Sequence, residues 1–320
     1  MAKAIRYVLE ERIAEVRSRL EIGRVDGAIY EAVSRIRTLE ESLEYLRGTE
    51  NVELYRHFPV AAIATLEAYF RSVVTMIVDA GGEYLTRGLA LVGDKLKAAE
   101  AISILHKKVV SIGEIVAYSL PFSSLGHLES TLDQLIGQKF KILVRAAIDP
   151  FALRNQTPEA ALVVPDVSQL WASLQKTFEI RHVLAHESAT KFHVQYEQAL
   201  LSVESVSGII EAIDSVLWST VWKDEPLTQY EMNRHAYAEY HVQRSKLCAA
   251  IRNKRNELKD ARDASEFRSL HAQWKSWIRK WADYSADRFV GGSIRPMIHA
   301  SVMSGAYESR IKQIEDITGY

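Results

Sequence analysis

The sequence predicts an all-α protein. Apolar side chains recur every three or four positions along most of the 320 residues, as on one face of an α-helix, and strand-like alternation is sparse. Glycines and prolines interrupt this pattern often enough to define many separate helices. With 48% hydrophobic and 25% charged residues, the composition is ordinary for a folded globular chain.

The first 50 residues are expected to form an N-terminal helical hairpin or arm. One amphipathic series runs from Ile5 to Leu20 and a second from Val33 to Leu46, with glycines between them. The polar stretch Gly48 to Asn51 interrupts the pattern. These residues therefore belong either to the following bundle or to a separate dimerisation arm.

A helical bundle is predicted for residues 51–222. Pro59 stands in the first turn of a strongly apolar helix that continues to about Val78, and Gly81-Gly82 ends it. A proline-containing segment, 149–168, is expected to be a long loop. Further helices are expected at about 94–118, 124–146, 168–186 and 191–218.

Residues 223–320 are predicted to form a separate small helical domain. The linker candidate is Lys223 to Pro226, followed by helices at about 229–260 and 263–288 and a last helix after Gly291-Gly292-Ser293. This part holds 17 basic against 13 acidic residues, whereas residues 1–222 hold 23 against 28. The positive excess favours an anionic partner such as RNA, although a solvated helical surface explains it equally well.

The chain is expected to be cytoplasmic, with no membrane association. Its single cysteine, Cys248, excludes an internal disulfide and a cysteine-based zinc site, and it suits a reducing compartment. The N-terminal residues lack the apolar core of a signal peptide. The most apolar run, Val60 to Val78, carries Glu67 and Arg71 near its middle, which makes it a poor membrane span.

The candidate catalytic motif is Arg181-x4-His186. A chain with 24 arginines and 10 histidines is expected to contain about one such pair by chance, so the spacing alone carries no evidence. Its position is informative, because it ends an amphipathic helix marked by Leu170, Leu174 and Phe178.

A second pattern lies upstream, where the apolar helix from Phe58 to Arg71 has Glu67 embedded in Leu-Glu-x-Tyr. Together, this pattern and Arg-φ-x-x-x-His, with His182 at the polar position φ, resemble the HEPN superfamily (higher eukaryote and prokaryote nucleotide-binding domains). The resemblance covers about residues 51–222. It implies a HEPN-type four-helix bundle, a metal-independent endoribonuclease, and a site formed where two protomers of a homodimer meet. It also implies use as a toxin or phage-defence effector.

The residue chemistry agrees with RNA cleavage. An imidazole exchanges protons near neutral pH, so His186 suits an acid/base role, and the Arg181 guanidinium suits a phosphate clamp. His182 lies one helical turn before His186 and either orients it or contacts RNA. Glu67 is expected to hold Arg181 in place or to complete the site. No cofactor is implied.

Two other interpretations of this motif stay open. Arg181 can pair at the surface with Glu179 or Glu187, with His186 as a helix-end residue. His182 and His186 also have metal-ligand spacing, but the Glu of a His-Glu-x-x-His site is missing and His193 is a weak third ligand, so no metal is expected.

The C-terminal part carries another resemblance. It opens with Gln-x-x-Met-Asn ending at Asn233, continues with Trp277 after Gln273, then Gly291-Gly292-Ser293, and ends on a helix bearing Arg310. This order is similar to the lysozyme-inhibitor LprI-like N-terminal domain, without the cysteines of its exported members. The resemblance implies an accessory domain for partner or RNA binding.

Three tryptophans in this part, Trp274, Trp277 and Trp281, recur at helical steps. This recurrence is more typical of packing than of a stacking platform. The alternative to a ribonuclease is a non-catalytic helical module for dimerisation, with the C-terminal domain recruiting a protein partner. No Gly-rich phosphate loop, nucleophile elbow or kinase signature is found.

Overall fold

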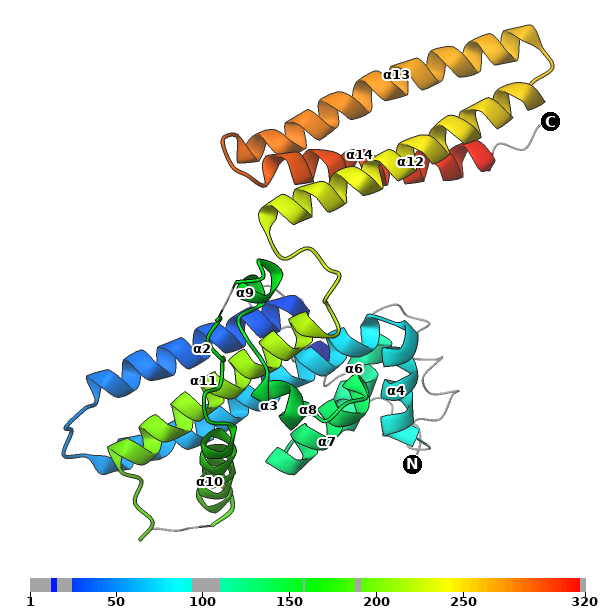
Figure 1. Cartoon of the computed structure of the whole chain (residues 1–320). Coiled ribbons are helices and arrows are strands. Elements are labelled where there is room, and N and C mark those ends of the chain that lie inside the picture. The colour runs from blue at the N-terminus through cyan, green and yellow to red at the C-terminus, as the bar shows by residue number, and fades with distance from the viewer. Residues whose placement is uncertain (1–12, 16–24, 94–109, 158, 188–190, 317–320) are drawn as a thin grey trace. The chain divides into compact units, whose positions relative to one another are not determined.

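The protein is all-α, as the sequence predicts (Figure 1). Helices make up most of the described chain, and its extended pairing is one antiparallel bridge between Ile148 and Leu162. The chain divides into two compact units, Met1–Lys223 and Asp224–Tyr320. The computed structural model describes residues 13–15, 25–93, 110–157, 159–187 and 191–316.

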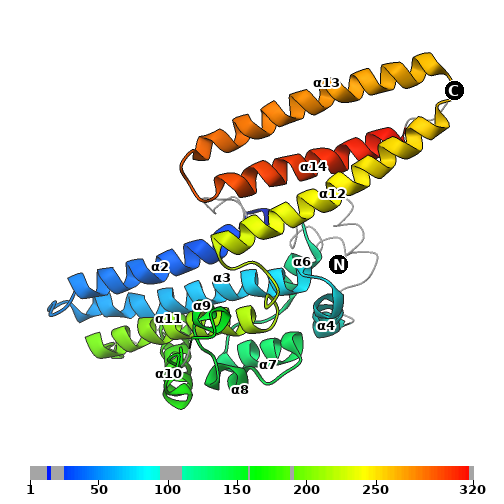
Figure 2. The ribbon, with the colours of Figure 1, turned by 45° about the horizontal axis from the view of Figure 1, so that its top comes forward.

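The centre of the first unit is α3 (His57–Asp79), which follows a short 3-10 turn, η1 (Val52–Arg56). Its sequence is apolar on nearly every face, so it is buried on nearly every face. Helices α2 (Val25–Tyr45) and α11 (Tyr196–Ser219) run beside it (Figures 1 and 2). By length and composition the segment Val52–Asp79 passes for a membrane span, but its apolar window is 61% buried, as in the core helix of a folded unit.

Helix α2 belongs to the same hydrophobic core as α3. Its apolar series places Ile36, Leu39 and Leu43 against α3 and α11, and all three are buried. The second helix of the expected N-terminal hairpin is therefore packed within the first unit. The first helix of that hairpin lies almost entirely outside the described residues; Ile13, which is described, is buried.

Six further helices complete the described part of the first unit. Two features differ from expectation. Helix α4 (Gly82–Val92) follows directly after Gly81, whose φ of 83° turns the chain. A one-turn helix, α9 (Pro150–Arg154), forms inside the segment 149–168 that is expected to be a loop. Of the expected helix 94–118, residues 94–109 lie outside the described chain. The helices are α4 (Gly82–Val92), α6 (Ile112–Ser119), α7 (Leu125–Ile136), α8 (Phe140–Arg145), α9 (Pro150–Arg154) and α10 (Val167–His186).

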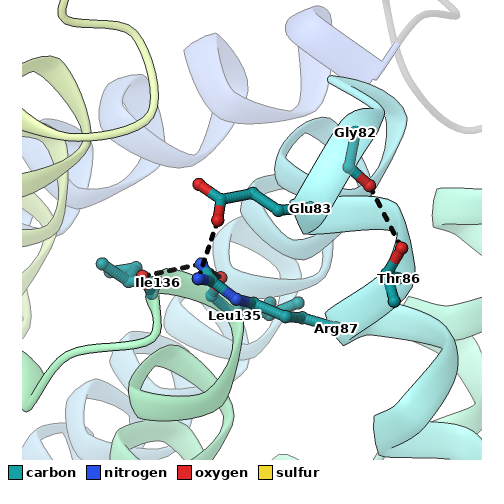
Figure 3. Close-up of polar contacts among 6 residues, drawn as sticks. All are labelled: Gly82, Glu83, Thr86, Arg87, Leu135 and Ile136. Carbon is teal, nitrogen blue, oxygen red and sulfur yellow. Dashed lines mark hydrogen bonds and ion pairs between the residues drawn. The ribbon is translucent and has the colours of Figure 1, made fainter.

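The helix expected at 124–146 is two helices because Gly137 adopts a left-handed conformation, with φ of 77°. Figure 3 shows Arg87 of α4 at this helix end, donating hydrogen bonds to the carbonyl oxygens of Leu135 and Ile136 at 3.2 and 2.9 Å. Glu83, one turn earlier on α4, holds the guanidinium through an ion pair of 2.8 Å. A cation at the C-terminal end of a helix also opposes its dipole.

The second unit has three long helices, with α14 lying between the other two (Figure 2). Thr228 and Asp260 cap the first two, and Pro296 occupies the first turn of the third. The helices are α12 (Gln229–Glu257), α13 (Ala261–Ala286), which runs on into the turn η3 (Asp287–Phe289), and α14 (Arg295–Glu315). Their shared core contains Leu247, Phe267, Ile278, Ala282, Met303, Tyr307 and Ile314.

Candidate functional site

The Leu-Glu-x-Tyr pattern lies in the middle of α3. Leu66 and Tyr69 are in the core, and the Tyr69 hydroxyl donates to the carbonyl oxygen of Ile210 at 3.4 Å. Burial raises the pKa of Tyr69 well above its ordinary value, so this phenol stays protonated. Glu67, between the two core residues, is turned to the rim of the unit, where 16% of its side chain is exposed.

Arg181 faces Glu67 from α10. Its Nη2 donates to Oε1 of Glu67 at 3.2 Å, forming an ion pair between two helices that are far apart in the sequence. Ile180 and Phe178 anchor this part of α10 in the core, which fixes the direction in which Arg181 leaves the helix. The structure thus brings together Arg181 and Glu67, two of the four residues proposed for the site.

The two histidines occupy the last turn of α10. The ring centroids of His182 and His186 are 5.0 Å apart, and both side chains are exposed. The α-helix ends at His186, and Glu187 is extended. His186 lies five positions after Arg181, which places their Cα atoms about 7.5 Å apart along the axis and roughly 140° apart around it. These two side chains therefore leave the helix in different directions.

The alternative in which Arg181 pairs at the surface with Glu179 or Glu187 differs from the observed contact of Arg181. Glu179 accepts a hydrogen bond from Gln175 at 2.9 Å, whereas the acidic partner of Arg181 is Glu67. Among the described residues, no three His, Cys, Asp or Glu side chains cluster as a metal site would require.

The second unit presents an aromatic surface that the sequence did not predict. Trp277 is 58% exposed and Trp281 49% exposed, so neither is packed as the helical recurrence suggests; Trp274 is partly buried against the core. Periodicity locates these side chains on one face of α13, but only the structure shows that α12 and α14 leave Trp277 and Trp281 exposed.

Two of the motifs that carry the C-terminal resemblance contact each other. Nε2 of Gln229 donates to Oδ1 of Asn233 at 3.1 Å, and Nδ2 of Asn233 donates to the carbonyl oxygen of Ser293 at 3.0 Å. The opening Gln-x-x-Met-Asn is thereby tied to the Gly-Gly-Ser turn, where Gly291 has a φ of 81°.

The second unit is thus a three-helix module in which the Gln-x-x-Met-Asn opening of α12 contacts the Gly-Gly-Ser turn before α14. Residues 223–314 match the family model described as "Lysozyme inhibitor LprI", which supports the predicted LprI-like part. The chain is also similar to MAGUK p55 subfamily member 3 of Rattus norvegicus, with 29% identity over 107 residues. That match covers 33% of this chain and 17% of the relative's length. No solved structure matches the chain.

Proposed function

We propose that the chain is a metal-independent endoribonuclease that acts as a cytoplasmic homodimer, with its site at Arg181 and His186. The observation that carries the proposal is the ion pair between Arg181 and Glu67. It joins the two helices whose patterns resemble the HEPN superfamily, at a place where two histidines are also exposed. A toxin or phage-defence role follows from the resemblance.

The chemistry proposed for this site needs no redox partner. A base removes the proton from the 2′-hydroxyl of the substrate, and the 2′-oxygen then bonds to the adjacent phosphorus. The bond from phosphorus to the 5′-oxygen breaks, and an acid protonates that oxygen. The products are a 2′,3′-cyclic phosphate and a 5′-hydroxyl. Arg181 offsets the charge that grows on the non-bridging oxygens, and Glu67 restricts the directions that the guanidinium can take.

A homodimer explains how the divergent side chains serve one reaction. Because Arg181 and His186 leave α10 about 140° apart, the two side chains of one protomer are poorly placed to contact the same phosphate. Two copies of the motif facing each other supply one imidazole as base and the partner subunit's His186 as acid. His182, beside His186, is proposed to orient that ring or to contact RNA.

The test is cleavage of labelled single-stranded RNA by the full chain in EDTA. We expect cyclic phosphate ends from the wild type and a loss of at least about a hundredfold in His186→Ala and Arg181→Ala. His193→Ala, which removes an exposed histidine a few residues beyond α10, is the matched control and should cleave normally. Full activity in His186→Ala would contradict the mechanism.

The alternative function is a non-catalytic helical module that recruits a protein partner through the second unit. The match of residues 223–314 to the LprI family is the observation that favours it. If purified wild-type chain cleaves none of a panel of RNAs, yet forms a stable homodimer and retains a protein partner, this alternative replaces the ribonuclease.

A further inference from the structure

A groove runs between α13 and α14 in the second unit. It encloses about 370 Å³. Indole rings of Trp274, Trp277 and Trp281 form the wall on α13, and the opposite wall on α14 combines small residues with the longer side chains of Arg310 and Gln313. The α14 residues at the groove are Ser301, Val302, Gly305, Ala306, Ser309, Arg310 and Gln313.

The exposed rings form a ladder along α13. Trp277 and Trp281 lie nearly parallel, with an angle of 8° between their planes and 6.1 Å between their centroids. Tyr284 continues the series at 5.7 Å from Trp281, and the Arg288 guanidinium lies 5.8 Å from the Tyr284 ring. Large exposed apolar side chains in a row are unusual on a protein surface unless they bind something.

Arg310 supplies a cation inside this groove. Its guanidinium lies 5.4 Å from the Trp274 ring, and its Nη1 donates to Oε1 of Gln313 at 3.0 Å. Its Nε–H is buried and donates to no acceptor among the described residues, and no described carboxylate forms an ion pair with the guanidinium. Burial lowers the pKa of this guanidinium, which nevertheless stays protonated at neutral pH.

The charges around the groove favour an anionic ligand. Two nearby acidic residues are already engaged: Asp287 of η3 pairs with Arg295 at 2.8 Å, and Asp283 of α13 lies 3.4 Å from His299. Arg288 and Arg310 add positive charge along the aromatic ladder, in a region with 17 basic against 13 acidic residues over 223–320. A ligand that fits must therefore combine flat apolar faces with negative charge.

We propose that the groove between α13 and α14 binds an unpaired nucleic-acid strand, with bases stacked on Trp277 and Trp281 and a phosphate at Arg310. Aromatic side chains beside cations are the usual means of holding single strands, because every base offers a flat face and every nucleotide a charge. Paired bases hide those faces, so a duplex should bind less well. This inference rests on the proposed ribonuclease function, in which the groove captures the RNA substrate.

The experiment measures binding of the full chain to a fluorescein-labelled deoxyadenosine 12-mer by anisotropy. This strand lacks the 2′-hydroxyl and is therefore resistant to the proposed cleavage. We expect Trp281→Ala and Arg310→Gln each to weaken binding about tenfold, and Trp281→Phe to keep most of the affinity. Affinity should fall with salt, with a shallower slope in Arg310→Gln.

Matched controls come from the same unit. Tyr230→Ala removes an exposed ring from α12, and Arg262→Gln an exposed cation from the start of α13; both should bind as the wild type does. Circular dichroism checks that Arg310→Gln keeps its helices. Wild-type affinity in both groove variants, no binding of the 12-mer, or equal binding of poly-glutamate would overturn the proposal.

His186→Ala separates this inference from the ribonuclease itself, because it should bind the 12-mer normally while losing cleavage. Binding of the 12-mer without cleavage of any RNA would support the groove as a nucleic-acid site and contradict the proposed ribonuclease function. Cleavage of RNA by a chain that does not bind the 12-mer would support the ribonuclease function and contradict the groove as a nucleic-acid site.

Discussion

Nη2 of Arg181 lies 3.2 Å from Oε1 of Glu67, and 114 residues separate the two in the chain. Both side chains are largely shielded from solvent, with exposures of 23% and 16%, so this pair is less screened than an ordinary surface pair. It joins α10 to α3 at the place where the Arg181-x4-His186 motif begins.

The energy of this pair is measurable by a double-mutant cycle. We expect Glu67→Gln and Arg181→Gln to be coupled by about 1 kcal/mol in the free energy of unfolding, because each single variant leaves a partly buried charge unpaired. Urea unfolding of the four proteins gives the value. The same cycle on Arg56 and Glu53, a pair with a 64% exposed carboxylate, should give a smaller coupling. Additive effects at Glu67 and Arg181 would contradict the expectation.

Gly137 is predicted to resist substitution. An alanine there must adopt a φ of 77°, and its Cβ would stand 2.7 Å from Cζ of Arg87. We expect Gly137→Ala to destabilise the first unit by about 1–2 kcal/mol from the backbone alone, with more if Arg87 is displaced from the end of α7. Thermal unfolding measures the change. Gly126→Ala, in the same helix with open space around it, should be neutral or stabilising.

Phe70 tests the core around α3. It is fully buried, with its ring centroid 4.9 Å from that of Phe122. We expect Phe70→Ala to lower the free energy of unfolding by about 3–5 kcal/mol, through lost burial and the cavity left behind. Tyr45→Ala removes a ring that is 92% exposed and should change stability little. Similar losses in the two variants, measured by urea unfolding, would argue against α3 as the centre of the unit.

His271 makes the second unit sensitive to pH. Burial, then the charges of Arg310 and Lys275, lower the pKa of this imidazole below its ordinary value of 6.5. Between the lowered pKa and 6.5 the unfolded chain binds more protons than the folded one, so stability falls as pH drops below about 6.5. Protection of α13 amides from hydrogen exchange should decrease accordingly, once corrected for intrinsic rates.

The matched variants isolate this histidine. His271→Asn should show less loss of α13 protection between pH 7.5 and 5.5 than the wild type. His235→Asn, at an exposed position on α12, should lose protection as the wild type does. An unchanged pH dependence in His271→Asn would refute the assignment.

Sequence periodicity predicted the helices that carry the candidate site, because their apolar series are long and their ends are marked. The expected helix at 168–186 matches α10 at Val167–His186 within a residue. The break at Gly137 was missed, since a single glycine inside an apolar pattern does not reveal its φ.

The site itself was predictable only in part. The contact between Arg181 and Glu67 was anticipated from a family resemblance, whereas helix periodicity gives no partner for either residue. Exposure of Trp277 and Trp281 could not be predicted, because periodicity places side chains on one face of a helix without showing what covers that face. The endoribonuclease activity and the homodimer remain predictions.

The position of α14 between α12 and α13 has a consequence during synthesis. The core residues of the two earlier helices, such as Leu247 and Ile278, share one hydrophobic cluster with Met303 and Tyr307 of α14, which contacts both helices. While the ribosome is still making α14, α12 and α13 have emerged or are emerging without their shared partner. The second unit is thus expected to close only after its last helix has been made, whereas the first unit can fold ahead of it.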